Sequence, residues 1–179
     1  FSLETILPTM AALALSVYIV LSAIGYAQSI PAGTLLSILE CGRYDEYQLW
    51  NTHSVPNQPY QTISVNSSPQ SCIDSSGGNI GTAPWIWSCN PTDDTNNNQW
   101  WRTMTTSNPK AVLLQTNPGR TCIQLTSNDT FSTTSMQTCY NDNILQQWIF
   151  NASTTYIQSA ANTSLCLTAT PSSILPNCT

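Results

Sequence analysis

The chain has 179 residues, of which only 7% are charged, and its formal net charge at pH 7 is −5. Four basic residues on an acidic chain make nucleic acid and anionic membrane surfaces poor partners, so neither is expected to bind. The seven cysteines are typical of an oxidising compartment, where disulfides persist, and they favour a secreted, extracellular protein.

The first 27 residues differ from the rest of the chain. A largely apolar run of fifteen residues, 10–24, is followed by Gly25, Tyr26 and Ala27, with small residues at the two positions that a signal peptidase reads. Fifteen residues are few for crossing a bilayer. We interpret residues 1–27 as a signal peptide. The alternative is a retained apolar helix, which would bring the protein to a membrane or form the core of a filament.

Beyond residue 28 the sequence pattern is that of short strands separated by turns. Apolar stretches such as 62–65, 111–115 and 156–158 lie between clusters of Asn, Pro, Gly and Ser. No helical period continues through any window of this region. The pattern predicts an all-β domain over residues 28–179.

A tripeptide repeat divides this domain into three units. Gln-x-Trp occurs at 48–50, 99–101 and 146–148, so the tryptophans lie 51 and 47 residues apart. Cysteines repeat in step: Cys72 and Cys122 are each followed by another cysteine 17 residues later, and Cys166 by one 12 residues later. A fixed period indicates one supersecondary unit built three times around a shared core. Four short strands in each unit give a closed twelve-stranded arrangement without exposed edges.

In these features the chain resembles the ricin-type lectin domain, a β-trefoil with Gln-x-Trp in each lobe, over roughly residues 34–179. The resemblance implies lobes of roughly 51–101, 102–148 and 149–179, with 34–50 closing the third. It also implies that Trp50, Trp101 and Trp148 pack in the core. It further implies disulfides within the lobes, Cys72–Cys89 and Cys122–Cys139.

The resemblance places a sugar site in the first lobe. In such lectins an Asp two residues after the first cysteine bonds sugar hydroxyls, and an aromatic two residues before the second cysteine stacks on the ring; an Asn and the Gln of Gln-x-Trp complete the site. The residues at these positions are Asp74, Trp87, Asn98 and Gln99. The implied ligands are galactose or N-acetylgalactosamine termini of glycans. Two alternatives stay open: in one, Asp74 caps a turn instead, and in the other, Trp85 rather than Trp87 is the stacking ring.

The other two lobes depart from this pattern. The second has Gln124, Gln137 and Leu145 at the Asp, aromatic and Asn positions, and the third has Thr168 and Pro176 at the first two. Without a carboxylate and a ring, most of the binding energy is lost. We therefore expect one working lobe.

The seventh cysteine creates an ambiguity. Cys41 lies nine residues before Trp50, as Cys139 lies nine before Trp148, so it occupies the position of a second cysteine. Cys41 and Cys178 therefore compete for Cys166. We expect Cys166–Cys178, with the strand that ends in Cys41 left over for self-association with another protomer. The alternative places this strand outside the barrel, with Cys41 unpaired or bonded elsewhere.

Asn-x-Ser/Thr triplets fit a secretory route and predict N-glycosylation. The candidate sites are Asn66, Asn128, Asn151, Asn162 and Asn177.

No pattern predicts an enzyme. His53, the one histidine, reads as a solvated loop residue, and the cysteines lack the spacing of metal ligands. No cofactor or metal is expected. The alternatives to a lectin are a structural subunit of an extracellular glycosylated filament and a trefoil that binds protein instead of sugar.

Overall fold

The computed structural model describes residues 30–90, 97–118 and 120–174. The segment interpreted as a signal peptide or apolar helix lies outside these residues, as do Cys178 and Asn177. Nowhere in the described part of the chain is there a helix of the length and apolarity needed to span a membrane.

In the described residues the fold consists of twelve strands, one helical turn, α2 (Asp45–Gln48), and four short 3-10 turns, of which three lie between strands and the fourth follows the last strand. The expected strands at 62–65, 111–115 and 156–158 are confirmed as β3, β7 and β11, each within about one residue. The strands are β1 (Leu35–Glu40), β2 (Trp50–Ser54), β3 (Gln61–Val65), β4 (Ser68–Asp74), β5 (Trp85–Ser88), β6 (Trp101–Thr105), β7 (Val112–Thr116), β8 (Thr121–Leu125), β9 (Thr134–Thr138), β10 (Trp148–Phe150), β11 (Ile157–Ser159) and β12 (Leu165–Thr170). The 3-10 turns are η2 (Ser76–Gly78), η3 (Asn97–Gln99), η4 (Ile144–Gln146) and η5 (Ser172–Ile174).

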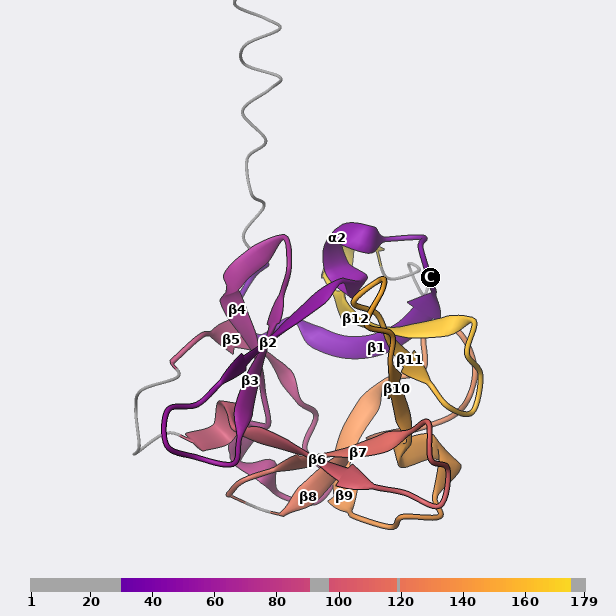
Figure 1. Ribbon diagram of the computed structural model, residues 1–179. Helices are drawn as coiled ribbons and strands as arrows, with labels where there is room; N and C mark the ends of the chain where they lie inside the picture. The colour runs from indigo at the N-terminus through magenta and orange to yellow at the C-terminus, as the bar shows by residue number, and fades with distance from the viewer. Residues whose placement is uncertain (1–29, 91–96, 119, 175–179) are drawn as a thin grey trace, which may run out of the picture.

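The strands are arranged as three lobes around a common axis (Figure 1). Antiparallel hairpins β2–β3 and β4–β5 build the first lobe, β6–β7 and β8–β9 the second, and β10–β11 with β12 and β1 the third. The lobes join where β3 meets β6, β7 meets β10 and β1 meets β5. The prediction of an all-β trefoil is confirmed.

The core lies on the axis and holds one Gln-x-Trp tryptophan from each lobe. Trp50, Trp101 and Trp148 are at most 3% exposed, as predicted. Each indole N–H donates to the backbone carbonyl that follows the first cysteine of a lobe: Leu167, Ile73 and Ile123, at 3.0, 2.9 and 3.3 Å. The large apolar area of an indole is buried without leaving its polar atom unpaired.

Each lobe contains one disulfide. Cys72–Cys89 and Cys122–Cys139 are present, each spanning 17 residues, as the resemblance implied. The third disulfide joins Cys41 to Cys166, so the expected Cys166–Cys178 bond is wrong. It ties together residues 125 positions apart in the chain.

Strand pairing explains the correction. β1 runs antiparallel to β12 over six residue pairs, from Leu35 opposite Thr170 to Glu40 opposite Leu165, which carries Cys41 to Cys166. The N-terminal strand is therefore part of the barrel and not left over. Cys41 is bonded to Cys166 within its own chain, so it is not the unpaired cysteine on which the expected link between protomers rested. Self-association of the chain stays a prediction.

Candidate functional site

The hairpin β4–β5 brings the first-lobe candidates together. Asp74 ends β4 directly opposite Trp85, and Cys72 lies opposite Trp87. Because side chains two residues apart share a face of a strand, the carboxylate and both indoles lie on the same side of the hairpin. Sequence spacing thus places the site without any long-range contact.

The Asp74 carboxylate is 4% exposed and is held by two donors. Its Oδ1 accepts from the Ser76 backbone N–H at 2.8 Å, and its Oδ2 accepts from Gln99 Nε2 at 3.3 Å. The chain turns sharply here, with Gly77 in the left-handed region at φ 83°, where glycine is favoured. Asp74 therefore does cap a turn. Since each carboxylate oxygen can accept more than one hydrogen bond, this role leaves acceptor capacity for a ligand.

Two indoles form an aromatic surface beside the carboxylate. Trp87 is 46% exposed and Trp85 is half-buried. Their rings stack with centroids 5.7 Å apart and planes 28° apart. An exposed indole on a hairpin is a flat apolar face that the folded core does not use. Trp87 is the more exposed of the two rings, and which of them stacks on a sugar stays a prediction.

A hollow of about 310 Å³ lies at this place, lined by Asp74, Ser76, Trp85, Trp87 and Asn98. Three of the four predicted site residues meet there. Ser76 was not predicted as a site residue. Its position in the hollow depends on a left-handed backbone conformation, at φ 52°, that the sequence does not indicate.

Gln99, the fourth predicted residue, does not line this hollow. It is 1% exposed, and its amide is fully engaged with the protein. Its Oε1 accepts from the Asn90 N–H at 2.8 Å, and its Nε2 donates to the Ser88 carbonyl at 2.8 Å as well as to Asp74. Gln99 therefore positions the carboxylate.

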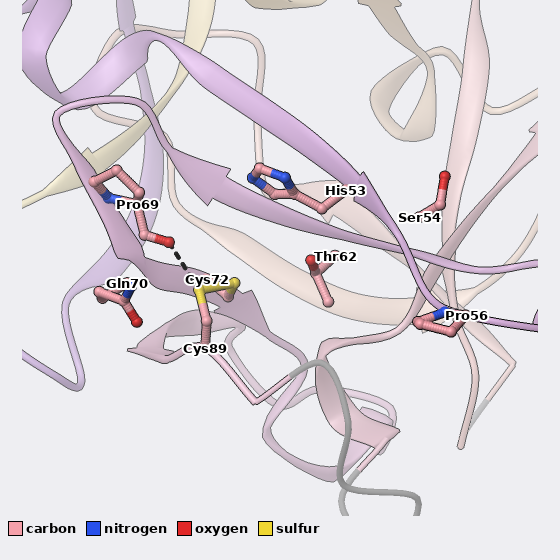
Figure 2. Close-up of a pocket in the computed structure, with 8 residues that line it drawn as sticks. All are labelled: His53, Ser54, Pro56, Thr62, Pro69, Gln70, Cys72 and Cys89. Atoms are coloured by element: carbon pink, nitrogen blue, oxygen red, sulfur yellow. Dashed lines mark hydrogen bonds between the residues drawn. A yellow bond between two sulfur atoms is a disulfide. The ribbon is translucent and has the colours of Figure 1, made fainter.

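A second hollow, of about 440 Å³, lies in the same lobe between the hairpin β2–β3 and the Cys72–Cys89 disulfide (Figure 2). His53 is at its edge and lies on strand β2, not in the loop expected from the sequence. The two hollows share no lining residue.

The same glutamine framework recurs in all three lobes. Gln48 Nε2 donates to the Glu40 carbonyl, and Gln146 Nε2 donates to the Thr138 carbonyl, as Gln99 does to Ser88. In each case the glutamine Oε1 accepts from the N–H of the residue after the second cysteine. What varies is the residue at the Asp74 position.

In the second lobe that residue is Gln124. Its Oε1 accepts from Asn143 Nδ2 at 3.0 Å and from Gln146 Nε2 at 2.9 Å, so the oxygen that corresponds to the carboxylate is already used within the protein. Ser135 and Gln137 stand where the first lobe has its two indoles.

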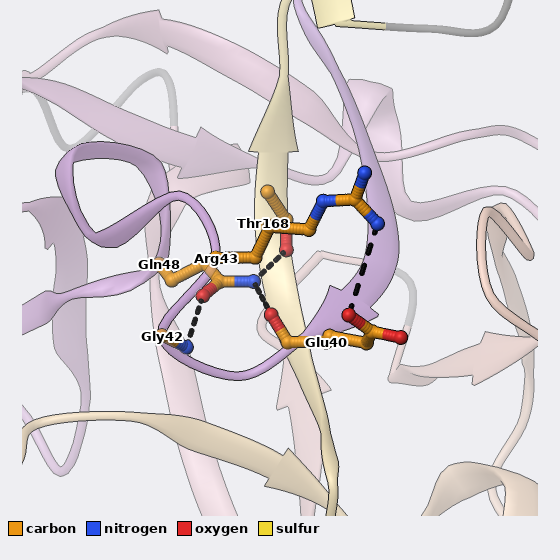
Figure 3. A network of polar contacts seen from close by, with 5 residues as sticks. All are labelled: Glu40, Gly42, Arg43, Gln48 and Thr168. Carbon is orange, nitrogen blue, oxygen red and sulfur yellow. Dashed lines mark hydrogen bonds and ion pairs between the residues drawn. The ribbon is translucent and has the colours of Figure 1, made fainter.

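In the third lobe the residue is Thr168, which is fully buried and accepts from Gln48 Nε2 at 3.1 Å (Figure 3). The aromatic position is occupied by Leu39, not by Pro176 as the expected disulfide implied, because Cys41 is the partner of Cys166. Leu39 is also fully buried. This lobe offers neither a carboxylate nor an exposed ring at the equivalent place.

One titrating group of the third lobe has a shifted pKa. The Tyr156 hydroxyl donates a short hydrogen bond to Asp45. This bond, then partial burial, then the nearby carboxylate charge raise the pKa of Tyr156 above its ordinary value of 10.0. Across the residues that the structure describes, no cluster of His, Cys, Asp and Glu could hold a metal ion.

Comparison with solved structures agrees with the fold. ThreeFoil, a designed three-fold symmetric protein, aligns at a TM-score of 0.57 and 16% identity over 70% of this chain and 86% of its own. The Polyporus squamosus lectin, solved with the epitope Neu5Aca2-6Galb1-4GlcNAc, has a TM-score of 0.44 and 17% identity over 67% and 49%. The Haemophilus ducreyi cytolethal distending toxin has a TM-score of 0.44 and 11% identity over 64% and 78%.

Among curated proteins, none matches this chain in sequence. The family profile of the ricin-type beta-trefoil lectin domain matches residues 60–177, which is more than half of the chain. Together with the twelve-stranded trefoil, this match shows that the chain belongs to the ricin-type β-trefoil lectin family.

Proposed function

We propose that this protein is a secreted lectin with one working sugar site, formed by Asp74, Trp87 and Asn98 in the first lobe. The observation that carries the proposal is the convergence of a carboxylate and an exposed indole on one hollow. The proposed ligands are glycans that end in galactose or N-acetylgalactosamine.

Each residue has a distinct part in binding. Asp74 accepts hydrogen bonds from two neighbouring sugar hydroxyls, and its charge strengthens them. Trp87 covers the apolar C–H face of the ring and excludes water, while Trp85 extends this surface. The Asn98 amide donates to and accepts from a further hydroxyl. Ser76 and Gln99 fix the carboxylate in advance, so little ordering is required when sugar binds.

A site this shallow binds weakly. We expect a dissociation constant of about 1 mM to tens of micromolar for a single sugar, which corresponds to roughly −4 to −6 kcal/mol. Tight attachment to a cell or matrix then requires many copies of the ligand on one surface.

The proposed activity is binding without hydrolysis. Hydrolysis by a glycosidase uses two carboxyl groups on either side of the bond to be cleaved. The hollow is lined by one carboxylate, Asp74. Among the residues that the structure describes, no second acid and no histidine lines this hollow opposite Asp74.

Secretion and N-glycosylation are part of the proposal. Three disulfides favour an oxidising compartment. Asn66 and Asn128 are exposed, so a glycan could extend from them without displacing the core. Asn151 and Asn162 are half-buried and accept hydrogen bonds from Ser153 and Ser164, two residues on. Asn177 lies outside the described residues.

A glycan array tests the proposal, with the full chain compared with an Asp74→Ala variant. We expect the unmodified chain to bind terminal galactosides and the Asp74→Ala variant to lose this binding. Because the second-lobe Gln124 is the structural counterpart of Asp74, Gln124→Ala is a matched control that retains binding. Absence of binding by the unmodified chain, at ligand densities that detect millimolar sites, would contradict the proposal.

A further inference from the structure

The hollow beside His53 lies in the first lobe, at a place where the sequence of that lobe differs from those of the other two lobes. In each lobe the strand that precedes the first cysteine of the disulfide places one residue directly opposite that cysteine. In the second lobe it is Gln115, opposite Cys122, and in the third it is Gln158, opposite Cys166. In the first lobe the residue opposite Cys72 is Ser64.

Both glutamines bond a specific carbonyl. Gln115 Nε2 donates to the Arg120 carbonyl at 3.1 Å, and Gln158 Nε2 donates to the Thr163 carbonyl at 2.8 Å. The same carbonyls contact the sulfur of the second cysteine, at 3.3 Å from Cys139 and 3.8 Å from Cys41. The second and third lobes thus each fill the space beside the disulfide with a carboxamide from the protein itself.

The first lobe has the carbonyl but not the carboxamide. Cys89 Sγ lies 3.4 Å from the Pro69 carbonyl, which identifies Pro69 as the counterpart of Arg120 and Thr163 (Figure 2). Ser64 has no amide to offer, and its hydroxyl instead pairs with His53 Nε2 at 3.1 Å. The hollow of about 440 Å³ is lined by Pro69 and the disulfide, whose counterparts in the other lobes lie beside a glutamine side chain. From this correspondence we infer that the hollow takes the place of that side chain, although Ser64 itself is not among the lining residues.

The walls of this hollow specify the chemistry of a ligand. Pro56 and Pro69 offer apolar surface to a methyl group. The Thr62 hydroxyl and the Gln70 amide can bond the hydroxyls of a ligand, and His53 stands at the edge. The described residues that line the hollow include no carboxylate, lysine or arginine, and they therefore favour an uncharged ligand.

We propose that this hollow is a second binding site, which accepts the acetamido group of an N-acetylhexosamine in place of the missing glutamine carboxamide. The amide N–H of the ligand donates to the Pro69 carbonyl, and its methyl group packs between the prolines and the disulfide. The pyranose ring lies against His53 and Gln70. The site is independent of Asp74, because the two hollows have no residue in common.

The single histidine makes the test direct, because its imidazole gives one set of NMR signals. The full chain is titrated to high millimolar concentrations with N-acetylglucosamine and, in parallel, with glucose, which lacks the acetamido group. We expect N-acetylglucosamine to shift the His53 signals with saturation, and to show saturation transfer to its acetyl methyl group. Glucose should bind at least tenfold more weakly. Equal binding of the two sugars, or no response to either, would overturn the proposal.

Two variants at one position sharpen the test. Ser64→Gln restores the side chain of the other lobes and should weaken the response to N-acetylglucosamine at least tenfold. Ser64→Ala removes the bond to His53 but leaves the hollow open, so its affinity should stay within about threefold of the unmodified chain. Unchanged binding by a folded Ser64→Gln protein would contradict the proposal, as would complete loss in Ser64→Ala.

An Asp74→Ala variant separates this site from the proposed galactoside site. It should lose the galactoside response and keep the N-acetylglucosamine shift of His53. Loss of that shift in Asp74→Ala would show that N-acetylglucosamine binds at the first site and would reject a second one.

Discussion

The first lobe and the other two share a framework but differ in what is built on it. All three contain a disulfide, a buried Gln-x-Trp tryptophan bonded to a backbone carbonyl, and a glutamine that ties the second cysteine region to the lobe. Among the described residues, only the first lobe adds a carboxylate, an exposed indole and a half-buried indole to this framework. The difference teaches that the trefoil is held by residues common to the lobes, whereas the proposed sugar site consists of a few substitutions that contribute little to the fold.

The two hollows of the first lobe extend this lesson. One hollow lies beside Asp74, and the second lobe has Gln124 at that position, with its amide oxygen already hydrogen-bonded within the protein. The other hollow lies beside the Pro69 carbonyl, and the corresponding carbonyls of the other two lobes are bonded by a glutamine side chain. In both places the protein supplies fewer of its own polar contacts in the first lobe than elsewhere. Both proposed sites therefore lie in the lobe that leaves hydrogen-bonding groups without a partner from the protein.

The largest effect should come from the disulfide that closes the framework. Replacing Cys41 and Cys166 together by Ala removes a link that spans 125 residues, which the chain-entropy estimate values at about 5 kcal/mol. The equivalent double replacement of Cys72 and Cys89, which span 17 residues, should cost about 3 kcal/mol. Denaturant unfolding measures both free energies. A larger loss for the shorter link would contradict this ordering.

The next contrast is between a framework tryptophan and a site tryptophan. Trp101→Ala should lower the free energy of unfolding by about 3–5 kcal/mol, because the ring is fully buried and its N–H is bonded. Trp87→Ala should lower it by less than about 1 kcal/mol, because nearly half of that residue is exposed. Urea unfolding of both variants measures these two losses of unfolding free energy. Similar losses in the two would mean that Trp87 belongs to the framework.

A third prediction concerns affinity. Trp87→Ala should weaken binding of a galactoside by about 1–2 kcal/mol, roughly five- to thirtyfold, because the apolar face of the sugar loses its cover. Gln137→Ala, at the corresponding position of the second lobe, should change affinity by less than twofold. Calorimetry or NMR titration gives both values. An effect at Gln137 equal to that at Trp87 would indicate that the second lobe also binds.

The smallest effect is expected in the third lobe. Tyr156→Phe removes one exposed hydrogen bond to Asp45 and should cost about 0.5 kcal/mol. Since the folded state raises the pKa of Tyr156, the contribution is fully present below the ordinary value of 10.0 and declines as pH rises through the raised pKa. The difference between the two proteins should therefore shrink at strongly alkaline pH. A difference that grows with pH would contradict the assignment.

Much of this organisation could be predicted from the sequence because the fold repeats. The spacing of Gln-x-Trp and cysteine predicted a unit repeated three times in an all-β domain. The family resemblance that rests on this spacing implied the trefoil, the buried tryptophans and the meeting of Asp74 with Trp87. Each of these depends on residues close in the chain or on a repeated unit.

The failures have long-range causes. Cys166 has two candidate partners at comparable positions, and only the pairing of β1 with β12 decides for Cys41. Gln99 was expected both to hold the turn and to touch the sugar. Three hydrogen bonds to the protein agree with the first role, and contact with a sugar stays a prediction. The hollow beside Pro69 was not predicted from the sequence. We attribute it to the short side chain of Ser64, and a single short residue forms no recognisable sequence motif.

The most direct test of the central claim follows the six tryptophan indole signals by NMR while a terminal galactoside is added to the full chain and to its Asp74→Ala variant. If binding is confined to the first lobe, the Trp87 and Trp85 signals shift with a millimolar or tighter saturation curve, the buried Trp50, Trp101 and Trp148 signals do not, and the variant shows no shift. Saturable binding that leaves Trp87 unmoved, or that survives in Asp74→Ala, would contradict the account.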